Sequence, residues 1–284
     1  MRLLILGGSG MLGHQLWRGL HAQHDTWVTL RRPVADFAAH NLFDEAKAIQ
    51  FDDITDDTAL ERALGQAKPE AVINCVGLIK QRDEASDEAL TLRVNAEFPH
   101  RLAKRCGEAG ARLIHFSTDC IFAGTKGNYT ESDPSDATDL YGQSKHQGEV
   151  ADAHSVTLRT SVIGHELGTK LALLDWFLSQ RGQAINGYTK AIYSGFTTLE
   201  MAGIIGWILT RHPELSGLGH VASEPISKFD LLQLCREKLG WEGVIEPNDE
   251  FVCDRSLNAD RFNQATGYTP PSWEAMISEL AQQS

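Results

Sequence analysis

Long apolar runs are absent from the 284-residue sequence, and no stretch approaches the roughly 20 apolar residues that a membrane-spanning helix needs. The first apolar run, residues 3–6, ends after four residues at two glycines, so it lacks the hydrophobic core of an export signal. Apolar residues make up 42% and charged residues 23% of the chain, which is usual for a soluble globular protein. We therefore expect a cytoplasmic protein with no membrane partner.

Cysteine is also scarce, and the five cysteines show no metal-ligand spacing. An odd number of them in a chain without an export signal indicates reduced thiols, so we expect neither a disulfide framework nor a metal. Positive charge is in deficit, because 38 acidic residues against 26 basic ones give a formal net charge of −12. That balance argues against nucleic acid as a partner, and local donors have to hold any anionic ligand.

Short β-rich runs alternate with helix-length segments over residues 1–160. Apolar strands separated by amphipathic crossovers are typical of parallel strands buried on both faces. The pattern therefore predicts an α/β fold with a doubly wound, Rossmann-type parallel sheet. The predicted strands are residues 2–6, 26–30, 71–76, 112–117 and 155–160.

The alternation weakens after residue 165, where longer helical segments are linked by Gly, Pro and Ser. We expect a dinucleotide-binding domain over residues 1–164 and a smaller, mostly helical substrate region over residues 165–284, with a possible return of one strand to the sheet. The predicted late helices are residues 170–180, 197–212, 227–240 and 272–283.

A glycine-rich turn, "GGSGMLG", follows the first predicted strand directly. Without a Cβ the backbone can approach a pyrophosphate closely, and the start of the next helix offers free N–H groups to the phosphates. Strand, turn and amphipathic helix agree, so the sequence predicts a dinucleotide site. The predicted contacts are Gly7, Ser9, Gly10, Met11, Leu12 and Gly13.

The second predicted strand ends in Arg31 and Arg32, where NAD-binding chains carry an acidic residue for the ribose hydroxyls. Guanidinium groups suit a 2′-phosphate instead, so we expect NADP(H), although two arginines at a strand end can also be merely solvated. Further along, "FDDIT" resembles the acidic-apolar step that flanks the adenine in related folds, with Asp53 and Ile54 as candidates.

A phenol and an ammonium lie four residues apart in "LYGQSK", at Tyr141 and Lys145. On a helix they project from one face. Ser117 and Thr118 end the strand that precedes them, at the sheet edge where α/β folds bind ligands. We expect Thr118 to hydrogen-bond a substrate carbonyl, Tyr141 to donate a proton, and Lys145 to hold the cofactor ribose and to lower the pKa of the tyrosine.

Pro99 lies inside an apparent helix and offers no N–H to the carbonyl of Asn95. Two outcomes stay open. The helix is simply kinked there, or the free carbonyl holds a water that relays protons toward Lys145.

With these motifs in this order, the chain resembles the extended short-chain dehydrogenase/reductases. More narrowly, residues 116–149 followed by "TLRTSVIG" are similar to the dTDP-4-dehydrorhamnose reductase group, and the likeness runs across nearly the whole chain. The resemblance implies that NADPH reduces the 4-keto group of a nucleotide-linked 6-deoxyhexose for surface polysaccharide, through Thr118, Tyr141 and Lys145. It also implies Arg159 and Arg255 as substrate ligands. The assembly is not fixed by the sequence, and a homodimer is left open.

Two departures from that group flank the expected sugar site. Cys120 replaces a usual Tyr, and "NCVGLIKQRDE" replaces an alanine-rich loop, so a related N-acetylated UDP-linked sugar is another candidate substrate. Asp119 is followed by Cys120 rather than by a second acid, which favours reduction over dehydration. A non-catalytic NADP-binding regulatory subunit and a nucleotide-sugar epimerase stay open as alternatives.

Overall fold

The structure is a computed structural model, and it describes residues 1–283; Ser284, the last residue of the predicted substrate region, lies outside the described residues. Its centre is a seven-stranded, all-parallel sheet in the order β3-β2-β1-β4-β5-β6-β11. The strands are β1 (Arg2–Leu6), β2 (Asp25–Leu30), β3 (Ala48–Gln50), β4 (Ala71–Asn74), β5 (Arg112–Thr118), β6 (Ser155–Thr160) and β11 (Gly217–His220). The Rossmann-type, doubly wound sheet is thus confirmed.

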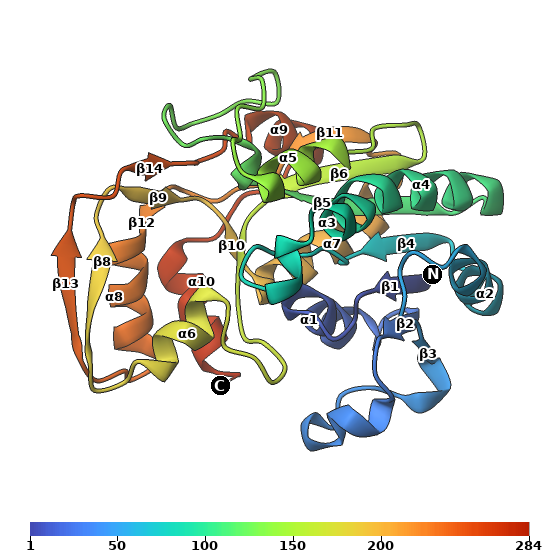
Figure 1. The fold of residues 1–284 in the computed structure, drawn as a ribbon, viewed down its shortest axis with the longest axis horizontal. Coiled ribbons are helices and arrows are strands. Elements are labelled where there is room, and N and C mark those ends of the chain that lie inside the picture. Colours follow the sequence, from blue (N-terminus) through green and yellow to red (C-terminus); the bar gives the residue numbers. More distant parts are fainter. Residues whose placement is uncertain (284) are drawn as a thin grey trace.

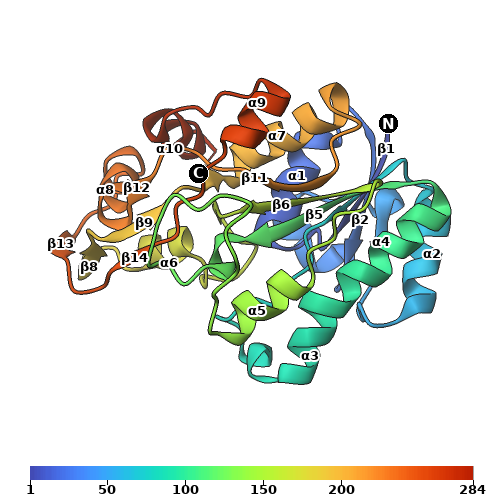
Figure 2. The same ribbon diagram turned by 90° about the horizontal axis from the view of Figure 1, so that it is seen from above.

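Helices cover both faces of this sheet (Figure 2). On one face α1 packs against α7, and on the other lie α2, α4 and α5. The strands of the central sheet are apolar on both sides for this reason, and the side chains of Leu3, Leu4, Ile5 and Leu6 are all fully buried. These helices are α1 (Met11–Leu20), α2 (Asp57–Ala67), α3 (Glu88–Leu92), α4 (Phe98–Ala109), α5 (Leu140–Gln147) and α7 (Thr198–Arg211).

The second region lies beyond the carboxyl end of the sheet and mixes helices with short strands (Figure 1). Its helices are α6 (Leu173–Ser179), α8 (Lys228–Lys238) and α10 (Trp273–Ala281), whereas α9 (Asp260–Thr266) packs against β11 at the edge of the central sheet. Its strands are β7 (Val162–Ile163), β8 (Ala184–Tyr188), β9 (Ala191–Tyr193), β10 (Phe196–Thr197), β12 (Ile226–Ser227), β13 (Val244–Asn248) and β14 (Cys253–Asp254). They form three small sheets, β10 with β7, β13 with β8, and β9 between β12 and β14.

The chain past residue 164 does not stay apart from the central sheet. Helix α7 packs along α1, and β11 adds a parallel strand beside β6. Short helical turns complete the chain at η1 (Val34–His40), η2 (Glu45–Lys47), η3 (Asp83–Ser86), η5 (Asp119–Ile121) and the π-helical η4 (Arg93–Glu97). No helix in residues 1–283 combines the length and the apolarity that a membrane crossing requires.

Candidate active site

Helix α5 places Tyr141 and Lys145 at the carboxyl edge of the sheet. Asp139 caps the helix, since its Oδ1 accepts a hydrogen bond of 2.7 Å from the Gly142 N–H. A Cβ on Gly142 would lie 2.3 Å from the Cys120 carbonyl oxygen, so only glycine lets the helix pack this closely on the segment after β5. The Lys145 side chain is buried and donates a 2.6 Å hydrogen bond to the Phe116 carbonyl of β5.

Thr118 lies at the end of β5, facing the same helix. Its Oγ1 accepts a 3.1 Å hydrogen bond from the Cys120 N–H and donates one of 3.1 Å to the Asp119 carboxylate. Burial raises the pKa of Tyr141 above the ordinary phenol value; the nearby Cys120 thiol adds to the rise, and a hydrogen bond with Thr118 opposes it. The predicted trio of Thr118, Tyr141 and Lys145 is therefore brought together.

The lysine does not act on the tyrosine as expected from the sequence. Burial lowers the pKa of Lys145 to about 8, partly offset by the charge of Glu149, and its ammonium is turned to the Phe116 carbonyl. The pKa of Tyr141 is raised rather than lowered, so this part of the expectation is wrong for the structure. A phenol with a raised pKa keeps its proton at neutral pH, which is the state that a proton donor requires.

The glycine turn joins β1 to α1 in a conformation that demands glycine. Gly7 has φ of +81°, and a Cβ on Gly13 would lie 2.2 Å from the Gly7 carbonyl oxygen. Gly10 provides no side chain to cap α1, and the first turn of α1 carries no acidic residue. The N–H groups at the start of α1 are therefore well suited to an anion, and the donor set fits a pyrophosphate. Ser9, Met11 and Leu12 are half-buried in the same turn.

The two arginines lie just past β2, the neighbour of β1 in the sheet. Both are exposed. Arg32 stands 5.0 Å from the centroid of the Phe37 ring and 3.7 Å from the Asp36 carboxylate. After β3, the Asp53 carboxylate accepts hydrogen bonds of 2.8 Å and 2.7 Å from the Thr55 N–H and hydroxyl. Ile54 beside it is half-buried.

The side chain of Asn95 fixes the loop after β4, whereas the sequence indicated a role only for the backbone carbonyl of this residue. The Asn95 side chain accepts a 2.8 Å hydrogen bond from the Leu78 N–H, donates one of 2.9 Å to the Leu78 carbonyl, and donates one of 3.2 Å to the Ser144 hydroxyl of α5. A Cβ on Gly148 would lie 1.9 Å from the Asn95 carbonyl oxygen, so that carbonyl packs against the end of α5. The π-helical η4 immediately precedes α4, whose second residue is Pro99. In the sequence, the only indication of these side-chain contacts is that an asparagine lies within a helical stretch ahead of a proline.

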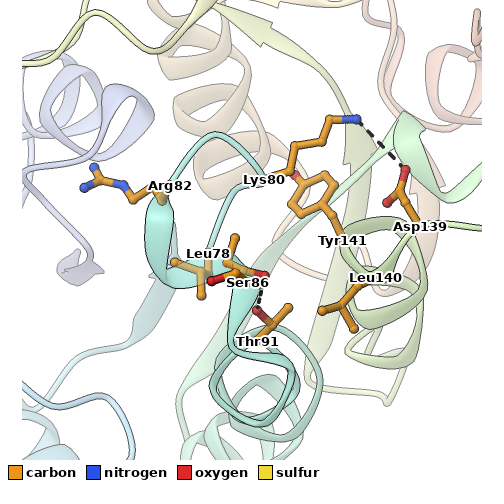
Figure 3. Close-up of a pocket in the computed structure, with 9 residues that line it drawn as sticks. Leu78, Lys80, Arg82, Ser86, Thr91, Asp139, Leu140 and Tyr141 are labelled. Carbon is orange, nitrogen blue, oxygen red and sulfur yellow. Dashed lines mark hydrogen bonds and ion pairs between the residues drawn. The ribbon is translucent and has the colours of Figure 1, made fainter.

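Tyr141 lines a cavity of about 560 Å³, which lies within the size range of small-molecule sites. The cavity opens between α5 and the loop after β4 (Figure 3). Its lining residues are Leu78, Lys80, Arg82, Ala85, Ser86, Thr91, Asp139, Leu140 and Tyr141.

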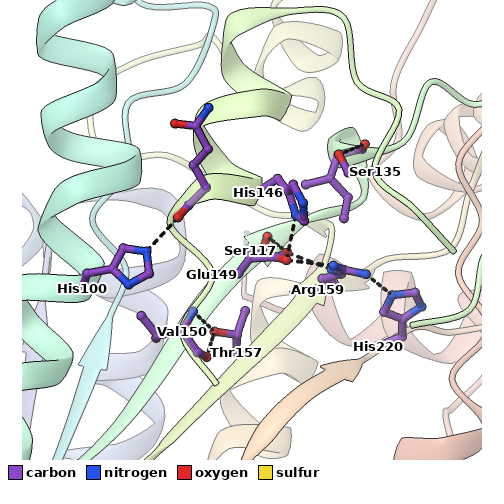
Figure 4. A network of polar contacts seen from close by, with 11 residues as sticks. His100, Ser117, Ser135, His146, Glu149, Val150, Thr157, Arg159 and His220 are labelled. Atoms are coloured by element: carbon purple, nitrogen blue, oxygen red, sulfur yellow. Dashed lines mark hydrogen bonds and ion pairs between the residues drawn. The ribbon is translucent and has the colours of Figure 1, made fainter. Parts of the chain in front are cut away.

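The two arginines expected to bind substrate lie in different surroundings. Arg255 is half-buried beside the site, donating a 2.7 Å hydrogen bond to the Phe122 carbonyl and one of 3.6 Å to the Cys120 sulfur. Arg159 is 3% exposed, and its guanidinium is held by Glu149 and His220 (Figure 4). The position of Arg159 therefore does not support the expectation that it binds substrate. Its guanidinium is buried and already donates two hydrogen bonds to the Glu149 carboxylate.

Glu149 is the centre of this buried network. Its carboxylate accepts hydrogen bonds of 2.8 Å and 2.7 Å from Arg159 Nε and Nη2, and one of 2.6 Å from the Ser117 hydroxyl. Ser117 and Arg159 are register partners on β5 and β6. Glu149 also follows Lys145 by four residues, so the network joins the segment just after α5 to both strands.

Comparison with known proteins gives a family match that covers most of the chain. Residues 1–184 match the family model described as the RmlD substrate binding domain. The chain is 33% identical over 151 residues to a dTDP-4-dehydrorhamnose reductase of Streptomyces griseus, a match that covers 53% of this chain and 44% of that protein. It is 29% identical over 240 residues to a probable dTDP-4,6-dihydroxy-2-methyloxan-3-one 4-ketoreductase of Streptomyces antibioticus, covering 82% of this chain and 75% of that protein.

The similarity to the Streptomyces griseus protein thus spans less than half of that relative's length. Among solved structures, a dTDP-4-dehydrorhamnose reductase from Bacillus anthracis, crystallised in complex with NADP, superimposes with a TM-score of 0.80 at 20% identity. That superposition covers 100% of this chain and 99% of the other, and it shows a shared fold.

Proposed function

Because the chain belongs to the RmlD substrate binding domain family, we propose that it is an NADP-dependent oxidoreductase that reduces the 4-keto group of a nucleotide-linked 6-deoxyhexose. The observation that carries this proposal is the convergence of Thr118, Tyr141 and Lys145 at one sheet edge, beside a cavity that the tyrosine lines. Two relatives that the chain matches are named as reductases of dTDP-linked keto sugars. The product would enter the synthesis of a surface polysaccharide.

The side chains divide the work of carbonyl reduction between them. The substrate carbonyl lies against Tyr141, whose phenol is protonated at neutral pH and donates its proton to the oxygen as negative charge develops there. Thr118 orients that oxygen through its hydroxyl. Lys145, fixed to the Phe116 carbonyl, keeps a buried positive charge near the reacting groups below pH of about 8.

NADPH is the cofactor that these residues would hold. When bound, it supplies the hydride for C4 of the sugar. The turn from Gly7 to Gly13 receives the pyrophosphate, for which its positive φ and uncapped helix start are suited. Arg31 and Arg32, both exposed past β2, would contact the 2′-phosphate, and Asp53 and Ile54 would lie by the adenine.

The test is a panel of dTDP- and UDP-linked 4-keto-6-deoxy sugars, with NADPH consumption followed by absorbance. We expect turnover with at least one member, and a loss of about a hundredfold or more in the Tyr141→Phe variant with little change in NADPH affinity. A panel without turnover, or an unchanged Tyr141→Phe variant, would refute the proposal. Reduced nicotinamide retained through purification would instead favour an epimerase.

A further inference from the structure

The cavity beside Tyr141 contains a positive charge to which the reaction assigns no role. Lys80 comes from the loop after β4, and its ammonium points toward Asp139, while Tyr141 lines the same cavity (Figure 3). Its Nζ lies 4.0 Å from Asp139 Oδ2, which is beyond hydrogen-bonding distance. The two side chains are 48% and 43% exposed. This is therefore a loose, hydrated ion pair, the kind that contributes least to stability.

The backbone that carries Lys80 is, by contrast, firmly held. Asn95 binds both the N–H and the carbonyl of Leu78, two residues earlier. Further back, a Cβ on Gly7 would come within 3.1 Å of the Val76 side chain, so the loop starts against the glycine turn. The backbone of Lys80 is thus fixed while its ammonium is exposed and weakly paired, which suits a side chain that changes partner when a ligand binds.

The position of Lys80 points to the substrate rather than to the cofactor phosphates. The loop leads from the glycine turn, where the pyrophosphate of a dinucleotide would bind, to the catalytic tyrosine, and Lys80 lies at its tyrosine end. In a chain with a formal charge of −12, an anionic substrate depends on such local cations. A sugar linked to dTDP or UDP carries a diphosphate.

We propose that Lys80 binds an anionic oxygen of the substrate diphosphate, leaving Asp139 for the ligand. This inference rests on the proposed function, because it takes the substrate to be a nucleotide sugar. A phosphate oxygen offers a shorter, charge-assisted hydrogen bond than the present 4.0 Å contact. Lys80 would then be a substrate-recognition residue, and Asp139 would compete with the substrate for it.

The experiment measures binding of UDP-glucose and dTDP-glucose by calorimetry with saturating NADPH present. Lys80→Met should weaken the tighter of the two by roughly tenfold to a hundredfold, the loss expected for a charged hydrogen bond, and Lys80→Arg should restore most of it. Asp139→Asn should tighten binding a few-fold, because it removes a competing negative charge, while asparagine still caps α5. Lys104→Met, at an exposed position on α4, is the matched control and should bind as the unmodified protein does.

Opposite effects at Lys80 and Asp139 support the proposal, since a general loss of structure would weaken binding in both variants. The proposal is overturned if Lys80→Met binds normally, if it loses NADPH affinity, or if Asp139→Asn weakens binding. It is also overturned if neither nucleotide sugar binds. Failure of the proposed function would instead appear as absent NADPH oxidation, with these binding differences intact.

Discussion

Replacing Arg159 by Met should destabilise the protein by about 3 kcal/mol, which is the lower end of the cost of breaking a buried ion pair. The guanidinium is 3% exposed and makes a two-pronged contact with Glu149, at 2.8 Å and 2.7 Å. The lower end applies because the carboxylate would keep the Ser117 hydroxyl at 2.6 Å and the half-exposed His146 at 3.1 Å. In a chain of this size the loss corresponds to a fall in Tm of roughly 6–10 °C.

The loss should also depend on pH. Burial acts to raise the pKa of Glu149, but the hydrogen bonds and charge of Arg159 outweigh it and hold that pKa below its ordinary value. The pair therefore stabilises the native protein above the pKa of the unfolded carboxyl and ceases to do so as the pH falls below it. Without Arg159, burial dominates and raises the pKa. A carboxyl with a raised pKa is tolerated when protonated, so the deficit of the variant should grow between pH 5 and pH 8.

Urea unfolding followed by circular dichroism at both pH values measures this deficit. Arg2→Met, which breaks an exposed pair with Asp25, is the control and should cost no more than about 1 kcal/mol. A double variant, Glu149→Leu with Arg159→Met, should recover most of the stability, because no charge is then left buried. A single-variant loss below about 1 kcal/mol, or a loss independent of pH, would refute the reasoning.

Three further predictions concern the cofactor and the reaction. Gly13→Ala should abolish NADPH binding, measured by nicotinamide fluorescence, because the added Cβ would lie 2.2 Å from the Gly7 carbonyl oxygen. The control is Gly65→Ala on α2, where a Cβ meets nothing within 4 Å; this variant should bind NADPH normally and be more stable to unfolding by up to about 1 kcal/mol. Turnover should fall as the pH rises through about 8, when Lys145 loses its proton, and steady-state rates against pH should report a single titration. Changing Arg31 and Arg32 together to Glu and Ala should lower kcat/KM for NADPH roughly tenfold or more and spare that for NADH.

Each of these predictions has a clear contrary result. An alanine at the third glycine that still binds NADPH would place the pyrophosphate elsewhere. A rate that stays level to pH 9.5 would mean that the lysine charge is not needed. Equal losses for both dinucleotides in the double arginine variant would mean that neither arginine reads the 2′-phosphate.

Much of the central sheet could be predicted because its strands have buried faces on both sides. Strands β1, β4, β5 and β6 contain apolar runs because helices cover both faces of the sheet. Such apolar runs can be recognised in a single sequence. The proximity of Thr118, Tyr141 and Lys145 was also predictable, since Thr118 ends a strand and the other two share a helix face. Both features depend only on the spacing of residues that are close together in the sequence.

Other features depend on contacts that sequence pattern does not encode. Strand β11 reads "GLGH", with two glycines and no apolar run, and it exists because the edge of β6 is free to pair. The surroundings of Arg159 were missed because Glu149 lies ten residues earlier on a different element. The hydrogen bonds of the Asn95 side chain were not predicted, because the missing N–H of Pro99 concerns only the Asn95 carbonyl, whereas the side chain binds Leu78 and Ser144.

The return of α7 and β11 to the central sheet has a consequence for engineering this protein. The polypeptide passes between the central sheet and the second region near residues 161, 198 and 221, and it returns to β11 again at α9, so more than one linker joins them. A truncation at residue 164 would strip the outer edge of β6 and leave it open to aggregation. Transplanting the second region from another member of the family therefore requires several splice points, with residues 198–220 and α9 retained from the recipient.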